Sequence, residues 1–384
     1  MRRRLESHRR GLICGAIGRA QLVARSMRLS ILLPTHRHDL PALGRIAQAC
    51  SWAGPDLEVL IRDNSGNAQK RELLERFERE YVTIVFAEPC EPLENYSELL
   101  RMAKGEFLYC VADDDFCFDR AMAALPGLLD QVSGDVSVAG VTGGYAVESS
   151  KGSSVVGYQD IDSDDVVARI TGYLSYQGPN VLAYSPFRRA MVERVFVFMN
   201  TMPHFFSFHD QIQCLLYLLN GRFVRLQRLL YLYDVGIWEA PEAAQKRDAD
   251  FYRAAGLDPA VNKLHWVLCG FEGAVLTLNS DLAQNLSKAQ RQSVADRWFS
   301  TMFVRFKGQP RLTFDSQFSR QAEQLCAKLQ TSTGQLSFQS MLAEISSFFG
   351  LFSQVHAQRY FDFWDMVVNR RQPAVPPHRM GAVA

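Results

Sequence analysis

Three consecutive aspartates, Asp113 to Asp115, are the residues of this sequence with the clearest chemical potential. They directly follow the apolar segment 107–111, which has the composition of a buried strand. Adjacent carboxylates at the end of a buried strand repel one another and lose hydration. A divalent cation such as Mg²⁺ or Mn²⁺, bridging to a phosphate group, would remove that cost. A solvated acidic turn, or capping of the next helix, is the alternative.

Two other predicted strands also end in polar residues. Segment 29–33 continues into Pro34 and Thr35, and segment 57–61 is followed closely by Asp63. In an open parallel sheet, ligands bind outside the carboxyl ends of the strands. The three polar strand ends therefore predict one site at a common edge, with a nucleoside diphosphate as its natural bridging ligand.

The elements that position these residues alternate between short apolar strands and amphipathic helices. This pattern is typical of a mostly parallel sheet covered on both faces. We therefore predict an α/β fold with a twisted sheet flanked by helices and an appended α-helical C-terminal region. The expected strands are 29–33, 57–61, 82–86 and 107–111, and the expected helices are 38–51, 69–81 and 94–104.

The pattern changes after about residue 130. We expect strands at 136–147 and 154–158 around a turn at Gly143-Gly144, and another strand at 180–184. An apolar helix is expected at 209–220. Two strands should follow at 223–226 and 229–233, and helical periodicity dominates from 241 to 370.

Composition limits the class of protein. The chain has 384 residues, 47% of them hydrophobic, and a net charge of +1, which disfavours a disordered chain and a nucleic-acid binder with a strong overall field. Its eight cysteines are scattered without a CxxC pair, which indicates a reducing compartment and no structural zinc. No apolar run is long enough to span a bilayer.

The charge is unevenly distributed. Residues 1–28 hold eight arginines and one acid, Glu6. We expect a disordered basic leader at 1–27, with contact to anionic lipid as the alternative. The expected organisation continues with one domain made of two halves, at 28–130 and 131–239, and the family resemblance given next implies that the first is a donor half and the second an acceptor half. A helical region at 240–371 and a disordered tail at 372–384 follow.

Most of residues 28–235 resembles family 2 glycosyltransferases with the GT-A fold. The matching segments occur in the family's order and spacing. They are SILLPTHRHDLPAL at 30–43, EVLIRDNSGN at 58–67, ENYSELLRMAKGEFLYCVADDDF at 94–116 and FHDQIQCLLYLLNGRF at 208–223.

The resemblance implies roles in binding a nucleotide-sugar donor. Pro34 and Thr35 would line the nucleobase pocket, Asp63 would accept a hydrogen bond from the base, and Asn95 would lie near the donor. Asp113 would hold the ribose or a metal-bound water.

The same resemblance implies a metal site of the DxD type. Asp113 and Asp115 match its outer carboxylates and would hold Mn²⁺ or Mg²⁺, while Asp114 shares either task. The sequence departs from the family after Pro34-Thr35, where His36-Arg37-His38 replaces the usual Tyr-Asn-Arg.

Asp210 matches the catalytic base of an inverting enzyme, although His209 replaces the acid that usually precedes it. Aspartate at a helix start is equally common as a cap, and that reading stays open. The Gln-x-x-Arg-Trp signature of processive synthases is absent, which favours transfer of a single sugar. Tyr231 and Tyr233 suit either an acceptor platform or the core.

The resemblance implies a metal-dependent, inverting glycosyltransferase of bacterial surface polysaccharide or glycoconjugate synthesis. Its partners would be a nucleotide sugar and a glycan or lipid-linked acceptor, without nucleic acid. It would be cytoplasmic, with peripheral contact at the inner membrane face left open. The alternatives are a nucleotidyltransferase, disfavoured by the missing glycine-rich loop, and a non-catalytic sugar-nucleotide-binding or scaffold protein.

Overall fold

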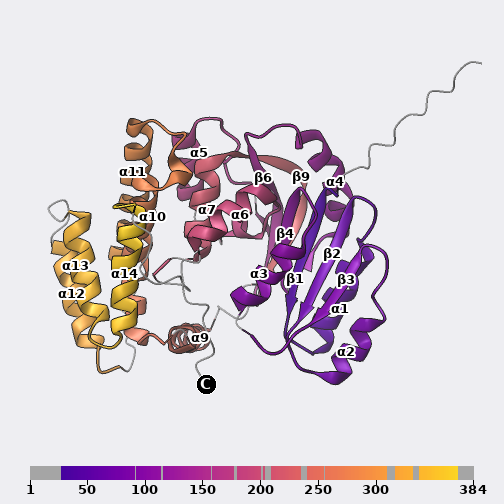
Figure 1. Ribbon diagram of the computed structural model, residues 1–384, viewed down its shortest axis with the longest axis horizontal. Helices are drawn as coiled ribbons and strands as arrows, with labels where there is room; N and C mark the ends of the chain where they lie inside the picture. The colour runs from indigo at the N-terminus through magenta and orange to yellow at the C-terminus, as the bar shows by residue number, and fades with distance from the viewer. Residues whose placement is uncertain are drawn as a thin grey trace, which may run out of the picture.

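The computed structural model describes most of the chain between residues 27 and 370 (Figure 1). The predicted tail, and the predicted leader apart from residue 27, lie outside the described residues. The described ranges are 27–90, 92–113, 116–156, 158–176, 180–199, 202–203, 209–234, 240–254, 256–308, 316–331 and 337–370.

The first half forms a parallel sheet. β1 pairs with β2 on one side and β4 on the other, and β3 extends the sheet from β2. Both faces of β1 and β2 are buried, which explains their continuous apolar sequence. The strands are β1 (Leu29–Thr35), β2 (Leu57–Asp63), β3 (Val82–Phe86) and β4 (Phe107–Cys110), and the helices are α1 (Leu40–Ser51), α2 (Ala68–Glu75), α3 (Pro92–Met102) and α4 (Asp119–Val132).

The second half continues the same sheet through antiparallel and parallel pairs. β4 is antiparallel to β8, and β8 is antiparallel to β6, so β6 runs in the same direction as β1 and β4. β9 is parallel to β6, and short β5 is antiparallel to β9. The carboxyl ends of β1, β2, β4, β6 and β9 therefore share one edge. The bounds are β5 (Phe116–Cys117), β6 (Val138–Ser149), β7 (Gly152–Val156), β8 (Phe187–Arg188) and β9 (Arg222–Asp234).

Three details of the second half differ from the expectation. β6 runs straight through Gly143-Gly144, and the turn to β7 lies at its end, after Ser149. The two strands expected at 223–226 and 229–233 are one strand, β9, with a bulge opposite Gly143 and Gly144. The segment expected as a strand at 180–184 instead forms a 3-10 turn, η1 (Val181–Tyr184). The first two errors arise because β6 and β9, which are distant in sequence, pair with each other along most of their length.

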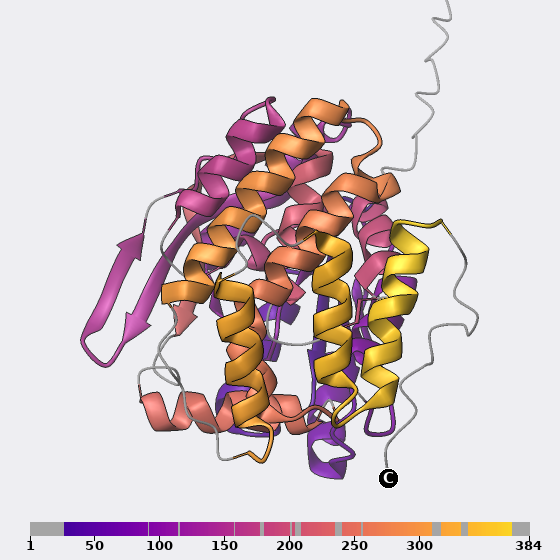
Figure 2. The ribbon, with the colours of Figure 1, turned by 90° about the vertical axis from the view of Figure 1, so that its left-hand side faces the viewer.

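A layer of helices stands beside the sheet and completes the molecule (Figures 1 and 2). None of the described helices is long and apolar enough to cross a bilayer. The helices before β9 are α5 (Val166–Ser175), α6 (Arg189–Met199) and α7 (His209–Asn220). Those after it are α9 (Pro241–Ala254), α10 (His265–Asn279), α11 (Lys288–Gly308), α12 (Ser319–Thr331), α13 (Phe338–Phe349) and α14 (Gln354–Val367), and short turns η2 (Pro259–Leu264) and η3 (Asp281–Ala283) flank α10.

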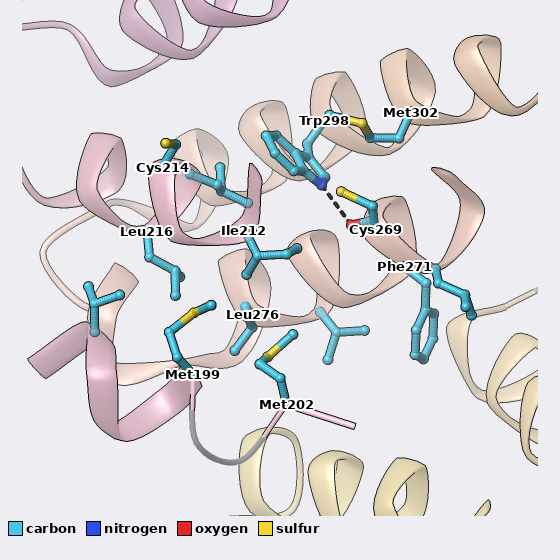
Figure 3. Close-up of a cluster of buried hydrophobic side chains, with 14 of the residues drawn as sticks. Met199, Met202, Ile212, Cys214, Leu216, Cys269, Phe271, Leu276, Trp298 and Met302 are labelled. Atoms are coloured by element: carbon cyan, nitrogen blue, oxygen red, sulfur yellow. Dashed lines mark hydrogen bonds between the residues drawn. The ribbon is translucent and has the colours of Figure 1, made fainter. Parts of the chain in front are cut away.

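One continuous core joins the helical region to the sheet-bearing half. Figure 3 shows side chains of α7, α10 and α11 packed together, and all of them belong to one buried cluster. Trp298 of α11 is fully buried and donates its indole N–H to the carbonyl of Cys269 at 3.0 Å. A second cluster fills the space between the sheet, α1 and α4.

Candidate functional site

Polar side chains converge at the carboxyl edge of the sheet, where β1, β2 and β4 end. Thr35 ends β1, Asp63 ends β2, and Asp113 follows β4 after two residues. All three side chains are buried. The structure thus brings together three residues that the sequence predicts for one site.

Asp113 is held by the end of β1 and the loop after it. The Thr35 hydroxyl donates to Oδ2 of Asp113 at 2.6 Å, and the backbone N–H groups of His36 and Arg37 donate to the same oxygen at 3.3 and 3.1 Å. All three bonds go to Oδ2, so Oδ1 is the oxygen left for a ligand. The carboxylate is therefore oriented before any ligand arrives.

Lys70 is the residue of this site that the sequence pattern did not reveal. The sequence predicts a charged surface helix here, yet Lys70 is only 1% exposed. Its Nζ lies 2.7 Å from both Asp63 Oδ1 and Thr35 Oγ1. The signal was available, because Lys70 lies one helical turn before the fully buried Leu74 and so shares its inward face. Leu73, beside it on the same helix, is 39% exposed.

The Asp63 carboxylate is engaged within the protein. It accepts bonds from the backbone N–H and the hydroxyl of Ser65, at 3.2 and 3.0 Å, in addition to the ion pair with Lys70. Its neighbour Asn64 donates its side-chain N–H to the carbonyl of Cys90 at 2.9 Å. The Oδ1 atom of Asn64 is buried and has no hydrogen-bond partner among the described residues. Asn64 therefore offers an acceptor that a ligand N–H would satisfy.

Asn95 is held against β2 by Arg62, a second residue that the sequence pattern did not reveal. The Arg62 guanidinium donates to Asn95 Oδ1 at 2.8 Å, and Asn95 donates back to the carbonyl of Arg62 at 3.3 Å. Arg62 also contacts the Cys90 sulfur at 3.2 Å. Pro34 is the partner of Arg62 in the β1–β2 register, which places it in the same neighbourhood.

Asp114 and Asp115 lie outside the described residues. No cluster of three metal-ligating side chains occurs in the described part of the chain. Asp113 nonetheless fits a hard cation, because its carboxylate is oriented through one oxygen and leaves the other for a ligand. The two aspartates beside it, which lie outside the described residues, are the further ligands that the sequence predicts.

Asp210 lies in the first turn of α7 and is half-buried. Its Oδ2 accepts from the side chain of Asn180 at 2.9 Å, and its Oδ1 accepts from the backbone N–H of Gln211 at 2.8 Å. The Tyr173 hydroxyl lies 2.9 Å from Asn180 Oδ1 and from Gln211 Oε1, which fixes both. Burial raises the pKa of the Asp210 carboxyl, and the two hydrogen bonds oppose that rise.

No protein-family model and no curated protein matches this sequence. Among solved structures, the chain is similar to residues 1–349 of TarS from S. aureus in complex with UDP-GlcNAc, with 14% identity, a TM-score of 0.50 and coverage of 90% of this chain and 93% of that one. The chain has the GT-A fold.

Two further structures show weaker similarity. TarS 1–349 alone is 15% identical, with a TM-score of 0.48 and coverage of 88% of this chain and 91% of that one. The mannosyltransferase PcManGT from Pyrobaculum calidifontis, in complex with GDP-Man and Mn²⁺, is 12% identical, with a TM-score of 0.39 and coverage of 88% and 86%. At such identities only the fold is shared, and the predicted α/β sheet with an appended helical region is confirmed.

Proposed function

We propose that this protein is a glycosyltransferase that moves one sugar from a nucleotide-sugar donor to an acceptor hydroxyl. The observation that carries the proposal is the buried chain Asp63–Lys70–Thr35–Asp113 at the carboxyl edge of a GT-A sheet. Burying three charged groups is costly, and such a cluster is typical of a functional site. The similar TarS structure is a complex with UDP-GlcNAc, which supports a nucleotide sugar as the donor class.

We assign the donor to the ends of β1, β2 and β4. Pro34 and Thr35 line the nucleobase pocket, Asn95 lies near the donor, and Asp113 holds the ribose or a metal-bound water. In this assignment an N–H group of the nucleobase donates a hydrogen bond either to Oδ1 of Asn64 or to the carboxylate of Asp63. The unpartnered amide oxygen favours Asn64, because Asp63 already accepts three bonds from the protein.

We also propose that Asp113 and Asp115 hold Mn²⁺ or Mg²⁺, with Asp114 assisting. The cation would neutralise the charge that develops on the leaving diphosphate. The role of Asp113 in this proposal is to present its Oδ1 atom to the cation. Its Oδ2 atom already accepts hydrogen bonds from Thr35 and from two backbone N–H groups.

Asp210 takes the proton from the acceptor hydroxyl in this proposal. Asn180 and Gln211 hold its carboxylate in place, and half-burial raises its pKa toward the range in which a carboxylate is an effective base. Attack from the face opposite the diphosphate gives inversion. The acceptor would be a glycan or lipid-linked sugar of a bacterial surface polysaccharide, modified at the cytoplasmic side of the inner membrane.

Thermal melting with a panel of nucleoside diphosphates and nucleotide sugars tests the proposal. We expect one nucleotide class to raise the melting temperature with Mn²⁺ or Mg²⁺ and to lose that effect in EDTA, because ligand binding to the native state stabilises it. Stabilisation that is equal in EDTA would remove the metal from the mechanism. If no nucleotide stabilises the protein at all, the donor site proposed here is wrong.

A further inference from the structure

Five tyrosines gather near the carboxyl ends of β6 and β9, on the same sheet edge as the donor site. We call them the tyrosine patch. Two lie on β9, one on β6, one ends η1, and one follows α5 directly. The members are Tyr145, Tyr176, Tyr184, Tyr231 and Tyr233.

The rings of the patch are packed against one another. Tyr184 stacks on Tyr231 with centroids 4.7 Å apart and an angle of 16°, and it meets Tyr233 at 5.7 Å. Tyr145, the register partner of Tyr231, meets Tyr176 edge-on at 6.3 Å. Tyr176, Tyr184 and Tyr233 remain partly exposed, so the patch is not wholly a part of the core.

Two hydroxyl groups of the patch are orphaned. The hydroxyls of Tyr145 and Tyr176 are buried and have no hydrogen-bond partner among the described residues. Nearby Tyr158, by contrast, donates its hydroxyl to the carbonyl of Leu226 at 3.1 Å. Buried polar groups in native proteins are almost always paired with protein, water or a ligand, so these two hydroxyls are free to bond to a ligand or to a water that a ligand displaces.

The patch lies between the two parts of the proposed catalytic centre. On one side, Phe116 follows the aspartate run and pairs with Leu232, which sits between Tyr231 and Tyr233. On the other side, Tyr184 is four residues after Asn180, the residue that holds Asp210. A 3-10 turn rises about 2 Å per residue, so the backbones of Asn180 and Tyr184, at the two ends of η1, lie within about 8 Å of each other.

We propose that the tyrosine patch binds the pyranose ring of the acceptor. The inference rests on the proposed function, and it names the acceptor class. A pyranose presents C–H faces that pack on aromatic rings and hydroxyls that bond to phenol groups, and tyrosine offers both in one side chain. The five side chains carry no positive charge, so they offer no ion pair to a phosphorylated acceptor.

The test pairs sugar binding with nucleotide binding in one set of variants. Saturation-transfer NMR, in the presence of UDP and diamagnetic Mg²⁺, measures binding of methyl glycosides of glucose, galactose, mannose and N-acetylglucosamine, with ribitol 5-phosphate as the open-chain probe. The variants are Tyr145→Phe and Tyr176→Phe, and Tyr158→Phe is the matched control. For each protein, calorimetry measures the affinity for UDP in the presence of Mn²⁺, and the melting temperature is recorded.

We expect at least one pyranoside to bind, and each of the two patch variants to weaken its binding about three- to tenfold, as for a lost neutral hydrogen bond. UDP affinity should not change. The melting temperature should stay the same or rise, because a buried orphan hydroxyl is removed, whereas a structural role would lower it. The control should keep wild-type sugar binding.

Three results would overturn the inference. If UDP binds but no pyranoside does, or if only ribitol 5-phosphate binds, the acceptor class is wrong while the proposed function stands. If the phenylalanine variants bind sugar as the wild type does, the patch is not the site. If UDP does not bind but another nucleoside diphosphate of the melting panel does, the sugar measurements are made with that nucleotide. If no nucleoside diphosphate of the panel binds, the proposed function fails and the inference fails with it.

Discussion

Asp210 accepts a backbone N–H in the first turn of α7 and also has the chemistry of a base, and substitution separates the two roles. Asp210→Asn keeps the shape and one accepting oxygen but removes the basicity. We expect turnover to fall about 10²–10⁴-fold, the usual effect of losing a general base, with nucleotide affinity unchanged. Steady-state kinetics and calorimetry measure the two effects. Full activity of Asp210→Asn would show that Asp210 is not the catalytic base and has only a structural role at the start of α7.

The raised pKa of Asp210 also predicts a dependence of stability on pH. The folded state holds the proton more tightly than the unfolded state, so this group stabilises the fold below its ordinary pKa of 3.8, and the contribution is lost as pH rises through the raised value. The difference in melting temperature, Asp210→Asn minus wild type, should therefore increase as pH rises from about 4 to 7. A difference that stays constant over this range would show that burial does not shift this carboxyl.

Lys70 shows how a buried charge ties the donor site to the fold. Lys70→Met leaves Asp63 buried without its counter-charge, and removal of one partner of a buried ion pair costs about 3–5 kcal/mol. We expect a loss of this size in the free energy of unfolding by urea, together with weaker nucleotide binding. Lys104→Met, at an exposed lysine, is the control and should change stability by less than about 0.5 kcal/mol. Equal stability of the two variants would show that the Lys70 ion pair contributes little.

At the scale of single residues, the sequence predicts the acidic and polar residues at the strand ends but not the residues that form hydrogen bonds and ion pairs with them. Thr35, Asp63 and Asp113 follow apolar strands, so their positions can be inferred from the strand pattern. Lys70 and Arg62 were missed because a charged residue on a helix or at a strand end is usually solvated. Only the three-dimensional arrangement shows that each has a buried partner.

At the scale of elements, α10 and α11 pack closely because α10 carries glycine where they touch. A Cβ atom on Gly273 would lie 2.2 Å from Nε1 of Trp298 and 2.9 Å from Leu215 of α7. Gly273→Ala should therefore destabilise the protein by about 1–3 kcal/mol, the usual effect of overpacking a core. Urea unfolding measures the change.

A second glycine provides the matched control. Gly44 lies within α1, and a Cβ atom added there would meet nothing within 4 Å. Gly44→Ala should therefore stabilise the helix by about 0.5–1 kcal/mol. The two substitutions are chemically identical and should have opposite signs. Two changes of the same sign would contradict the steric explanation.

The elements of the first half were predictable because each strand is buried on both faces and is joined to the next by a helix with local periodicity. The second half was less predictable for a physical reason. β5 and β8 have two residues each and exist only because distant strands pair with them. The bulge in β9 faces the glycines of β6, which the sequence pattern had indicated as a turn.

At the scale of the whole molecule, the helical region shares its core with the sheet-bearing half. Leu276 and Phe271 of α10 and Trp298 of α11 belong to the same buried cluster as Ile212 and Leu216 of α7 (Figure 3). The predicted boundary near residue 240 therefore divides the sequence into two stretches whose apolar side chains are buried against each other. Apolar burial is the main favourable term in folding, so neither stretch can lose its partner without a large cost.

A chain that ends at residue 239 tests this dependence. It exposes the apolar face of α7, so we expect it to lose its cooperative thermal transition and to aggregate, even though every described residue proposed for the site is retained. Removal of residues 1–26 is the control. Arg28, just after that cut, is anchored through ion pairs with Glu106 and Asp130 at 2.9 and 2.6 Å. That variant should melt as the full chain does. A cooperative melt and metal-dependent nucleotide binding in the chain ending at 239 would show instead that the sheet-bearing half is an independent folding unit, and that the helical region serves a function other than covering α7.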